Sequence, residues 1–189
     1  MSWIVAMADQ KRCWIVAAVI VAIDQVSKVW VHATLSDGPR MELIPGWLNF
    51  VYSRNPGGLF GYFTDLGQPW RTMLLTVLPV FAIALVVYYL VRGDDLDRTA
   101  RLALALVLGG AIGNLLDRMF RGEVIDFIDA QASGALGAWL IENTGTAHWH
   151  TFNVADSCIV SGAILLLISA FWPQRQTGRG VRPTEPVES

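Results

Sequence analysis

The chain has 189 residues, of which 53% are hydrophobic and 16% are charged, and its formal net charge is −2. An ordinary soluble domain has roughly a quarter of its residues charged, so this composition is typical of a membrane protein. The basic residues are dispersed and form no patch, which argues against a nucleic-acid-binding protein.

Four apolar segments are long enough to cross a hydrocarbon core, which needs about 20 residues of helix. They cover residues 13–31, 72–91, 101–117 and 154–172. The third is the shortest and the least apolar. The sequence therefore predicts an all-α membrane protein, with a four-helix transmembrane bundle within a single domain at 1–173.

The first of these segments resembles a secretory signal peptide, because Lys11 and Arg12 precede its apolar run. Asp24 and Lys28 interrupt that run, and no clean cleavage site follows it. We therefore interpret it as a retained first helix.

Basic residues orient the four spans, since cytoplasmic loops carry an excess of Lys and Arg. They precede span one, fill the short loop between spans two and three, and follow span four: Lys11 and Arg12; Arg92, Arg98 and Arg101; Arg175, Arg179 and Arg182. We expect both termini in the cytoplasm and the loops 33–71 and 118–153 outside. The Pro/Gly-rich tail at 174–189 is expected to be disordered.

The outer loops contain strand patterns. Residues 47–53, WLNFVYS, are aromatic and β-branched with partial alternation, and residues 123–128 are similar. These segments predict a small β-rich cradle at the membrane interface, where Trp and Tyr collect. The Ala/Gly-rich remainder at 129–151 predicts no particular fold.

Polar residues on two of the spans fall at the same depth. Counted from the cytoplasmic ends, Asp24 and Lys28 lie about 16 and 22 Å up the first span, and Asn114 and Asp117 lie about 20 and 24 Å up the third. Asp24 and Lys28 are four residues apart and can pair, and Asn114, Asp117 and Arg118 share one face. Polar residues are costly inside a bilayer, so such a cluster indicates a functional or structural site.

Two further carboxylates belong near the same surface. Asp126 follows the third span, and Asp156 begins the fourth. Two adjacent carboxylates can share a proton, and one then activates a water while the other polarises a carbonyl. This chemistry is that of an aspartic protease, but the sequence alone does not show that the two carboxylates meet, and for either residue taken singly the alternative that follows is favoured. The alternative is two independent aspartates at helix ends, with Asp156 stabilised by the helix dipole.

Other functions are compatible with parts of the sequence. A small proton-coupled transporter could use Asp24, Asp117 and Asp156, although the inner halves of the spans are almost devoid of polar residues. A membrane scaffold could pack through Gly109 and Gly113, which form a small-xxx-small pattern.

Two other kinds of catalytic or metal site have weaker support. His148 and His150 could bind a metal, but no third ligand stands at a recognisable spacing. Ser157 and Ser161 could belong to a hydrolase triad, but they lack a nucleophile-elbow pattern.

Five short motifs occur together in this chain: DQVSK (24–28), RNPGGLF (54–60), GNLLDR (113–118), VIDF (124–127) and FNVAD (152–156). With these motifs, in this order and with four spans, the chain resembles the bacterial lipoprotein signal peptidases, the type II signal peptidases. The resemblance covers roughly residues 14–172. It implies an aspartyl endopeptidase of the cytoplasmic (inner) membrane with its active site near the outer face.

The resemblance also implies roles for individual residues. Asp126 and Asp156 would be the catalytic dyad. The residues that position the substrate and the dyad would be Asn55, Asn114, Arg118 and Asn153. Those that support the polar layer would be Asp24, Lys28 and Asp117.

The implied substrate is a prolipoprotein whose cysteine already carries diacylglycerol, cleaved on the amino side of that cysteine. No cofactor is implied, the surrounding lipids are the other expected partner, and we expect a monomer. The interval from Asp126 to Asp156 is longer than is usual in the family by about a dozen residues, in a loop where insertions are tolerated.

Overall fold

The computed structural model describes residues 2–56, 67, 69–93 and 96–171. The predicted tail at 174–189 and residues 57–60 of the RNPGGLF motif lie outside the described residues. The elements in chain order are α1 (Ser2–Leu35), β1 (Met41–Ile44), β2 (Leu48–Asn55), α2 (Trp70–Thr72), a π-helical segment η2 (Met73–Val77), α3 (Leu78–Arg92), α4 (Arg98–Arg121), β3 (Val124–Ala130), α5 (Gly134–Thr144) and α6 (Val154–Phe171).

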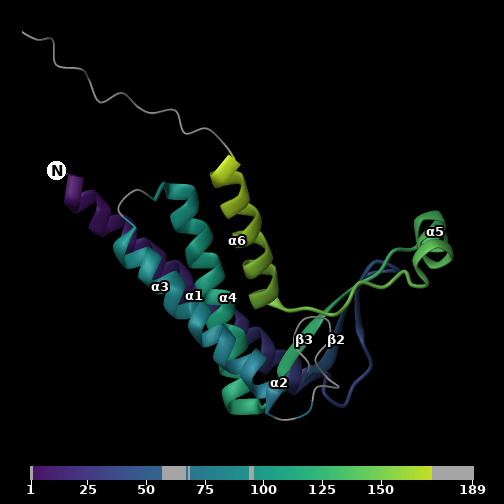
Figure 1. Cartoon of the computed structure of the whole chain (residues 1–189). Helices are drawn as coiled ribbons and strands as arrows, with labels where there is room; N and C mark the ends of the chain where they lie inside the picture. Colours follow the sequence, from purple (N-terminus) through teal and green to yellow (C-terminus); the bar gives the residue numbers. More distant parts are fainter. Residues whose placement is uncertain (1, 57–66, 68, 94–95, 172–189) are drawn as a thin grey trace, which may run out of the picture.

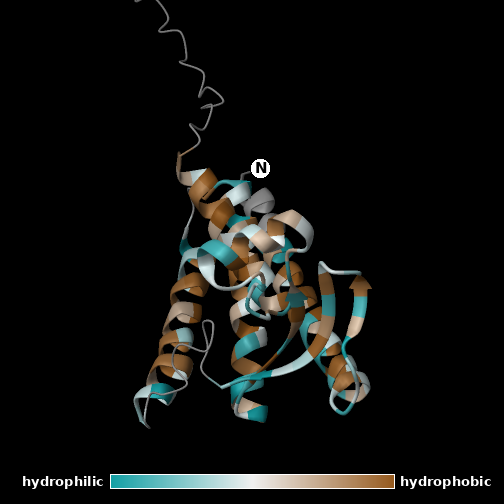
Figure 2. Ribbon diagram, turned by 90° about the vertical axis from the view of Figure 1, so that its right-hand side faces the viewer, coloured by the Kyte–Doolittle hydropathy of each residue, from teal (hydrophilic) through white to brown (hydrophobic). Residues whose placement is uncertain are grey.

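Four helical stretches are long and apolar enough to cross a membrane: Gln10–Leu35, Trp70–Arg92, Arg98–Arg121 and Val154–Phe171. They lie side by side in one bundle, with the sheet at one end and both the N-terminus and the end of α6 at the other (Figure 1). Figure 2 shows long hydrophobic stretches along these helices and mixed colours on the sheet. The predicted fold class is confirmed.

The third span is longer than the apolar pattern predicted. We expected it to end at Asp117 with Arg118 in a loop, but α4 continues to Arg121. Basic side chains in the last turn of a helix interact favourably with its dipole, and Arg118 and Arg121 occupy that turn. Gly122 then ends the helix with a left-handed φ of 80°. The last turn of the span is therefore stabilised by two charged side chains, although charged residues lower the hydropathy from which a span is predicted.

The second span changes its winding just before Pro79. The π-helical segment Met73–Val77 precedes that proline. Proline has no backbone N–H, so one helical hydrogen bond of the preceding turn cannot form, and the wider π-turn accommodates the loss. Pro79 therefore disturbs the regular winding of the second span.

The three strands form one antiparallel sheet in the order β1-β2-β3. Strands β2 and β3 are the two that the sequence predicted. Their register pairs Ser53 with Asp126 and Asn55 with Val124. Asp126 therefore lies at the end of the sheet that is nearest to the bundle helices.

Helix α4 is the central helix of the bundle, and two glycines let its neighbours approach closely. A Cβ at Gly110 would overlap the backbone carbonyl of Ala155 in α6, and a Cβ at Gly113 would lie 2.6 Å from Oδ2 of Asp24 in α1. Small residues permit such backbone contact between membrane helices. These contacts bring α1 and α6 against one segment of α4.

The end of α1 connects the bundle to the sheet. Val31 and Leu35 are buried with Ile125 and Phe127 of β3 in one hydrophobic cluster. The rings of Phe50 and Phe127 meet edge to face, with centroids 5.5 Å apart. This core fixes β3 relative to the helices, and so fixes the position of Asp126.

Candidate active site

A buried cluster of charges joins α1 to α4. Lys28 Nζ lies 2.8 Å from Oδ2 of Asp24 and 2.8 Å from Oδ2 of Asp117, and all three side chains are 0% exposed. Lys28 also donates a hydrogen bond of 3.0 Å to Asn114 Oδ1. The predicted Asp24–Lys28 pair and the common depth of the two helices are confirmed. The cluster fixes one helix at one height against the other.

Two members of this cluster were not predicted. The amide of Gln25 donates to Gly113 O and to Asp117 Oδ1, both at 3.1 Å. Arg121 donates to Gln25 Oε1 at 2.9 Å and forms an ion pair with Asp117. Arg121 is four residues after Asp117, so i,i+4 spacing would have identified it if the helix had been extended.

The first turn of α6 is closed by a reciprocal cap. The side-chain oxygen of Asn153 accepts a hydrogen bond of 2.9 Å from Asp156 N, and Asp156 Oδ2 accepts one of 3.2 Å from Asn153 N. This is the arrangement of a capping box, here made by Asn and Asp. Asp24 Oδ1 accepts a third bond, of 3.0 Å, from Ala155 N. The orientation of Asp156 is therefore set by the start of its own helix.

Asp126 reaches the same place from β3. Its Oδ2 accepts a hydrogen bond of 2.8 Å from Asn55 of β2, and its Oδ1 accepts one of 2.8 Å from Asn153. The carboxyl is 1% exposed. Asn153 therefore contacts both predicted catalytic aspartates.

Asn114 of α4 links Asp156, Asn153 and Lys28 in one hydrogen-bond network. It donates a hydrogen bond of 2.7 Å to Asp156 Oδ1, and its own oxygen accepts one of 3.1 Å from Asn153. Since the same oxygen also accepts from Lys28, the charged cluster connects directly to the aspartates. The structure brings eight of the nine predicted site residues into this network, namely Asp24, Lys28, Asn55, Asn114, Asp117, Asp126, Asn153 and Asp156.

Arg118 joins the site more loosely. Its guanidinium donates to the backbone oxygen of Asn114 at 3.4 Å and lies within electrostatic range of Asp156 and Asp126. Asp117, its sequence neighbour, forms its ion pairs with Lys28 and Arg121. Among the described residues, the guanidinium of Arg118 therefore has a backbone oxygen and no carboxylate as its hydrogen-bond acceptor.

Burial raises the pKa of Asp126 from its usual value near 3.8 to about 6. The charge of Asp156 acts in the same direction. The hydrogen bonds from Asn55 and Asn153, and the charge of Lys28, oppose the shift. A carboxyl group with this pKa can hold or release a proton near neutral pH, as acid–base catalysis requires.

The arrangement is two carboxylates held by a shared asparagine at the end of a membrane bundle. Residues 16–172 match the family model described as signal peptidase (SPase) II. This chain belongs to the signal peptidase II family. Signal peptidase II is an aspartic peptidase, so the transporter and scaffold hypotheses are set aside.

Curated relatives of this signal peptidase II cover most of its length. A lipoprotein signal peptidase of Solibacter usitatus is 40% identical over 161 residues, which are 85% of this chain and 91% of the relative. One of Psychromonas ingrahamii is 33% identical over 175 residues, which are 93% and 92% of the two chains.

Two solved structures, each described as a bacterial membrane enzyme, have the same architecture as this signal peptidase II. One has a TM-score of 0.67 and 27% identity and covers 90% of this chain and 93% of its own. The other has a TM-score of 0.69 and 28% identity, with 86% and 94% covered.

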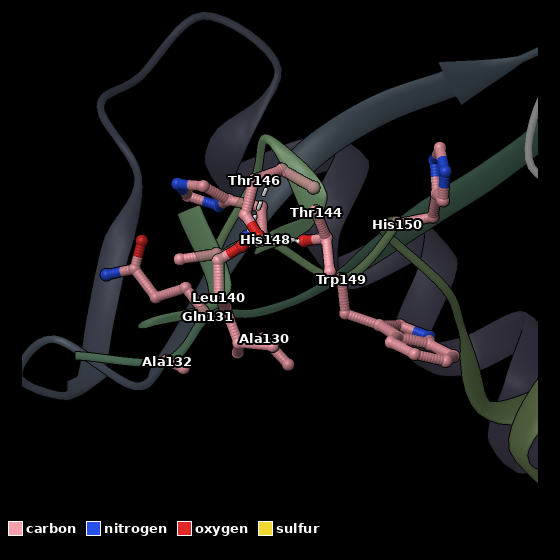
Figure 3. A pocket seen from close by; sticks show the side chains of 10 residues that line it. Ala130, Gln131, Ala132, Leu140, Thr144, Thr146, His148, Trp149 and His150 are labelled. Carbon is pink, nitrogen blue, oxygen red and sulfur yellow. Dashed lines mark hydrogen bonds between the residues drawn. The ribbon is translucent and has the colours of Figure 1, made fainter. Parts of the chain in front are cut away.

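His148 and His150, which the sequence offered as metal ligands, lie on the segment between β3 and α6. His148 Nδ1 lies 3.4 Å from Asp129 Oδ1, and Asn49 donates to the other oxygen of Asp129 at 3.0 Å. His148 and His150 both line a pocket of about 530 Å³ in this segment (Figure 3). Within the described residues, no three His, Cys, Asp or Glu side chains form a group able to hold a metal ion.

The serine alternative is not supported by the contacts. Ser157 donates its hydroxyl hydrogen bond, 2.9 Å long, to the backbone oxygen of Asn153. Ser161, one turn further along α6, is exposed on the surface of the span.

Proposed function

We propose that this enzyme removes signal peptides from prolipoproteins by an aspartyl mechanism in which Asp126 and Asp156 are the catalytic dyad. The observation that carries the proposal is the double role of Asn153, whose amide binds Asp126 and whose backbone N–H binds Asp156. A shared partner keeps both carboxyl groups directed at one place, where a water and a peptide bond can meet.

The pKa of Asp126, raised to about 6, suits it to hold the proton of the pair. Protonated Asp126 donates a hydrogen bond to the scissile carbonyl oxygen, and ionised Asp156 accepts a proton from the attacking water. The hydroxide oxygen bonds to the carbonyl carbon and gives a tetrahedral intermediate. Its collapse breaks the C–N bond, and the leaving nitrogen takes up the proton that Asp156 had accepted.

Arg118 and Asn114 complete the site in this proposal. Arg118 is half-buried, and within the described part of the chain its guanidinium donates to a backbone oxygen at 3.4 Å and to no carboxylate, which leaves donors for a backbone carbonyl of the substrate. Asn114 holds Asp156 and joins it to the buried charges of Lys28 and Asp117. The buried cluster thus supports the site without taking part in the proton transfers.

The substrate is a prolipoprotein whose cysteine carries diacylglycerol. The acyl chains of such a cysteine stay in the leaflet, so the amide before it is held at the membrane boundary. The site lies where both β3 and α6 begin, between the membrane spans and the sheet (Figure 1). A dyad at the membrane boundary can contact the scissile amide while the acyl chains of the cysteine stay in the lipid.

Both termini are cytoplasmic in this proposal, and the sheet and the dyad lie at the outer face of the bacterial inner membrane. Arg92, Arg98 and Arg101 lie at the opposite end of the bundle from the sheet, which agrees with the preference of Lys and Arg for the cytoplasmic side. Both the N-terminus and the end of α6 lie at that same end (Figure 1).

A cleavage assay with purified enzyme tests the substrate. The same precursor is supplied with and without diacylglycerol on its cysteine, and the new N-terminus is identified by mass spectrometry. We expect cleavage on the amino side of the lipidated cysteine and no cleavage of the unlipidated form. Equal processing of both forms would show that the lipid does not select the substrate.

A further inference from the structure

The insertion between β3 and α6 folds into an arm, defined here as residues 130–151. Its two sides run antiparallel, with hydrogen bonds of 2.9 Å from Ala132 N to Ala147 O and 2.8 Å from Trp149 N to Ala130 O. Helix α5 forms its tip, at the far end of the arm from the bundle (Figure 1). Because α5 lies away from Asp126 and Asp156, the arm does not cover the site as a lid.

One face of α5 packs on the arm itself. Gly137 is buried, and a Cβ there would overlap the backbone oxygen of Ala132. Leu140 and Thr144 line the pocket of the arm together with His148 (Figure 3). These contacts use the apolar and small residues on one side of the helix only.

The side of α5 next to this packed face is apolar and exposed. Leu136 and Trp139 are three residues apart, which places them on one side of a helix, and they are 50% and 57% exposed. On the returning side of the arm, Trp149 lines the edge of the same pocket and is still 64% exposed (Figure 3). Glu142 is the one Asp, Glu, Lys or Arg within the arm, so charge offers little for recognition of a protein partner.

This apolar face continues onto the sheet and from there to the spans. Gln131 N at the base of the arm donates a hydrogen bond of 2.8 Å to Trp47 O, and both Ile44 and Trp47 are exposed. The ring of Phe50 on β2 in turn meets Trp30 of α1, with centroids 6.1 Å apart. Trp30 belongs to a membrane span, so the surface that lipid covers on α1 extends towards the sheet and the arm.

We propose that α5 and Trp149 dock on the lipid surface of the leaflet at the sheet end of the bundle, as an interfacial anchor beside the spans. Trp side chains prefer the membrane–water boundary, and a helix with an apolar face can lie in that plane. Exposed Leu and Trp on a segment outside the spans would otherwise be costly in water. Since the arm returns directly to Asn153, the anchor also fixes the two chain segments that carry the aspartates.

Spin labels test this placement in the full chain. Nitroxide labels are attached to cysteines introduced by Leu136→Cys and Trp139→Cys. The control is Ala138→Cys, at an exposed position two residues after Leu136 and therefore on nearly the opposite side of α5. Cys13→Ser and Cys158→Ala first remove the native thiols. The protein is placed as single copies in nanodiscs of phosphatidylethanolamine and phosphatidylglycerol. Collision rates are then measured with oxygen, which concentrates in lipid, and with a water-soluble nickel chelate.

We expect an oxygen-to-nickel collision ratio that is several-fold higher at positions 136 and 139 than at 138. Equal ratios at all three positions would overturn the proposal. The proposal would also be overturned if the high ratio appeared only in discs that hold more than one copy and the spectra of the labels broadened one another. That result would identify a second copy of the chain as the occupant of this face. A second measurement leaves the cysteines intact. The contribution of Trp139 to the fluorescence is the difference between the natural enzyme and Trp139→Phe, and brominated lipid should quench that contribution. If brominated lipid left it unchanged, lipid docking would also be contradicted.

Discussion

The side-chain amide of Asn153 donates a hydrogen bond of 2.8 Å to Asp126, a residue 27 positions earlier in the chain. The same asparagine caps α6 through its oxygen. One side chain therefore fixes the start of the membrane helix α6 relative to the start of strand β3.

Two substitutions of Asn153 separate its two roles, which are to cap α6 and to bind Asp126. Asn153→Ser keeps a capping oxygen and loses the amide, and Asn153→Ala loses both. A catalytic group misplaced by about 1 Å can lose roughly 100-fold in rate, so we expect kcat to fall by about that factor in both variants. The alanine variant should also be less stable than the serine variant, by about 1 kcal/mol, because the helix cap is gone. Single-turnover cleavage and denaturant titration measure the two effects, and a serine variant with unchanged kcat would show that the amide does not position the dyad.

The pH dependence of cleavage follows from the pKa of Asp126. This carboxyl is protonated below about pH 6 and loses its proton as the pH rises above that value. If protonated Asp126 polarises the carbonyl, kcat should fall on the alkaline side with an apparent pKa near 6.

A substitution at Asn55 should shift that pH profile. Its hydrogen bond stabilises the carboxylate and so lowers the pKa of Asp126, and Asn55→Ala should therefore raise this pKa and move the alkaline limb to higher pH. Tyr52→Phe is the control, since it removes a hydroxyl of β2 that contacts His32 instead. A limb that stays in place, or moves to lower pH, in Asn55→Ala would be inconsistent with Asp126 as the proton holder.

Lys28 is expected to be a stability residue. Lys28→Met would leave Asp24 and Asp117 buried without their shared cation. Removing one partner of a buried ion pair typically costs about 3–5 kcal/mol. We expect a loss of that size in the free energy of unfolding, measured in bicelles by denaturant titration. Lys11→Met, at an exposed position, is the control and should change stability little; equal stability of the two variants would contradict the account of the cluster.

Gly110 tests the contact between α4 and α6. Gly110→Ala would push a methyl group against the carbonyl of Ala155, next to Asp156. Overpacking of this kind costs about 1–3 kcal/mol, and it would shift the start of α6. We therefore expect a lower kcat together with a lower melting temperature. Gly38→Ala, where the nearest atom is at an ordinary 3.5 Å, should behave like the natural enzyme; a Gly110→Ala enzyme with full activity would mean that the close approach is dispensable.

The spans and most of the site could be predicted because polar residues stand out in apolar sequence. Asp24, Lys28, Asn114 and Asp117 each interrupt a hydrophobic run, and helical rise places them at one depth. Their ion pairs confirm this reasoning.

Other parts of the structure could not be predicted, because no charged residue in an apolar run marks them in the sequence. Gln25 is uncharged and adjacent to Asp24, so nothing in the sequence marks the three hydrogen bonds that its amide donates or the one that it accepts from Arg121. Arg121 lies beyond the apolar run that defined the third span. Strand β1 is exposed at all four positions, so its residues show no alternation between a buried and an exposed face. Helix α5 contains glycines, which weaken helix propensity, and it forms because the arm packs against it.

The measurement that tests the central claim most directly is single-turnover cleavage of a diacylglyceryl-modified precursor by Asp126→Asn, Asp156→Asn and Asp129→Asn enzymes of verified fold and membrane insertion. Asp129 is the control, because it is another buried aspartate of β3 that contacts Asn49 instead of the dyad. We predict no detectable cleavage with Asp126→Asn or Asp156→Asn, and substantial cleavage with Asp129→Asn. Turnover at the natural rate by either dyad variant would contradict the aspartyl mechanism proposed for this site.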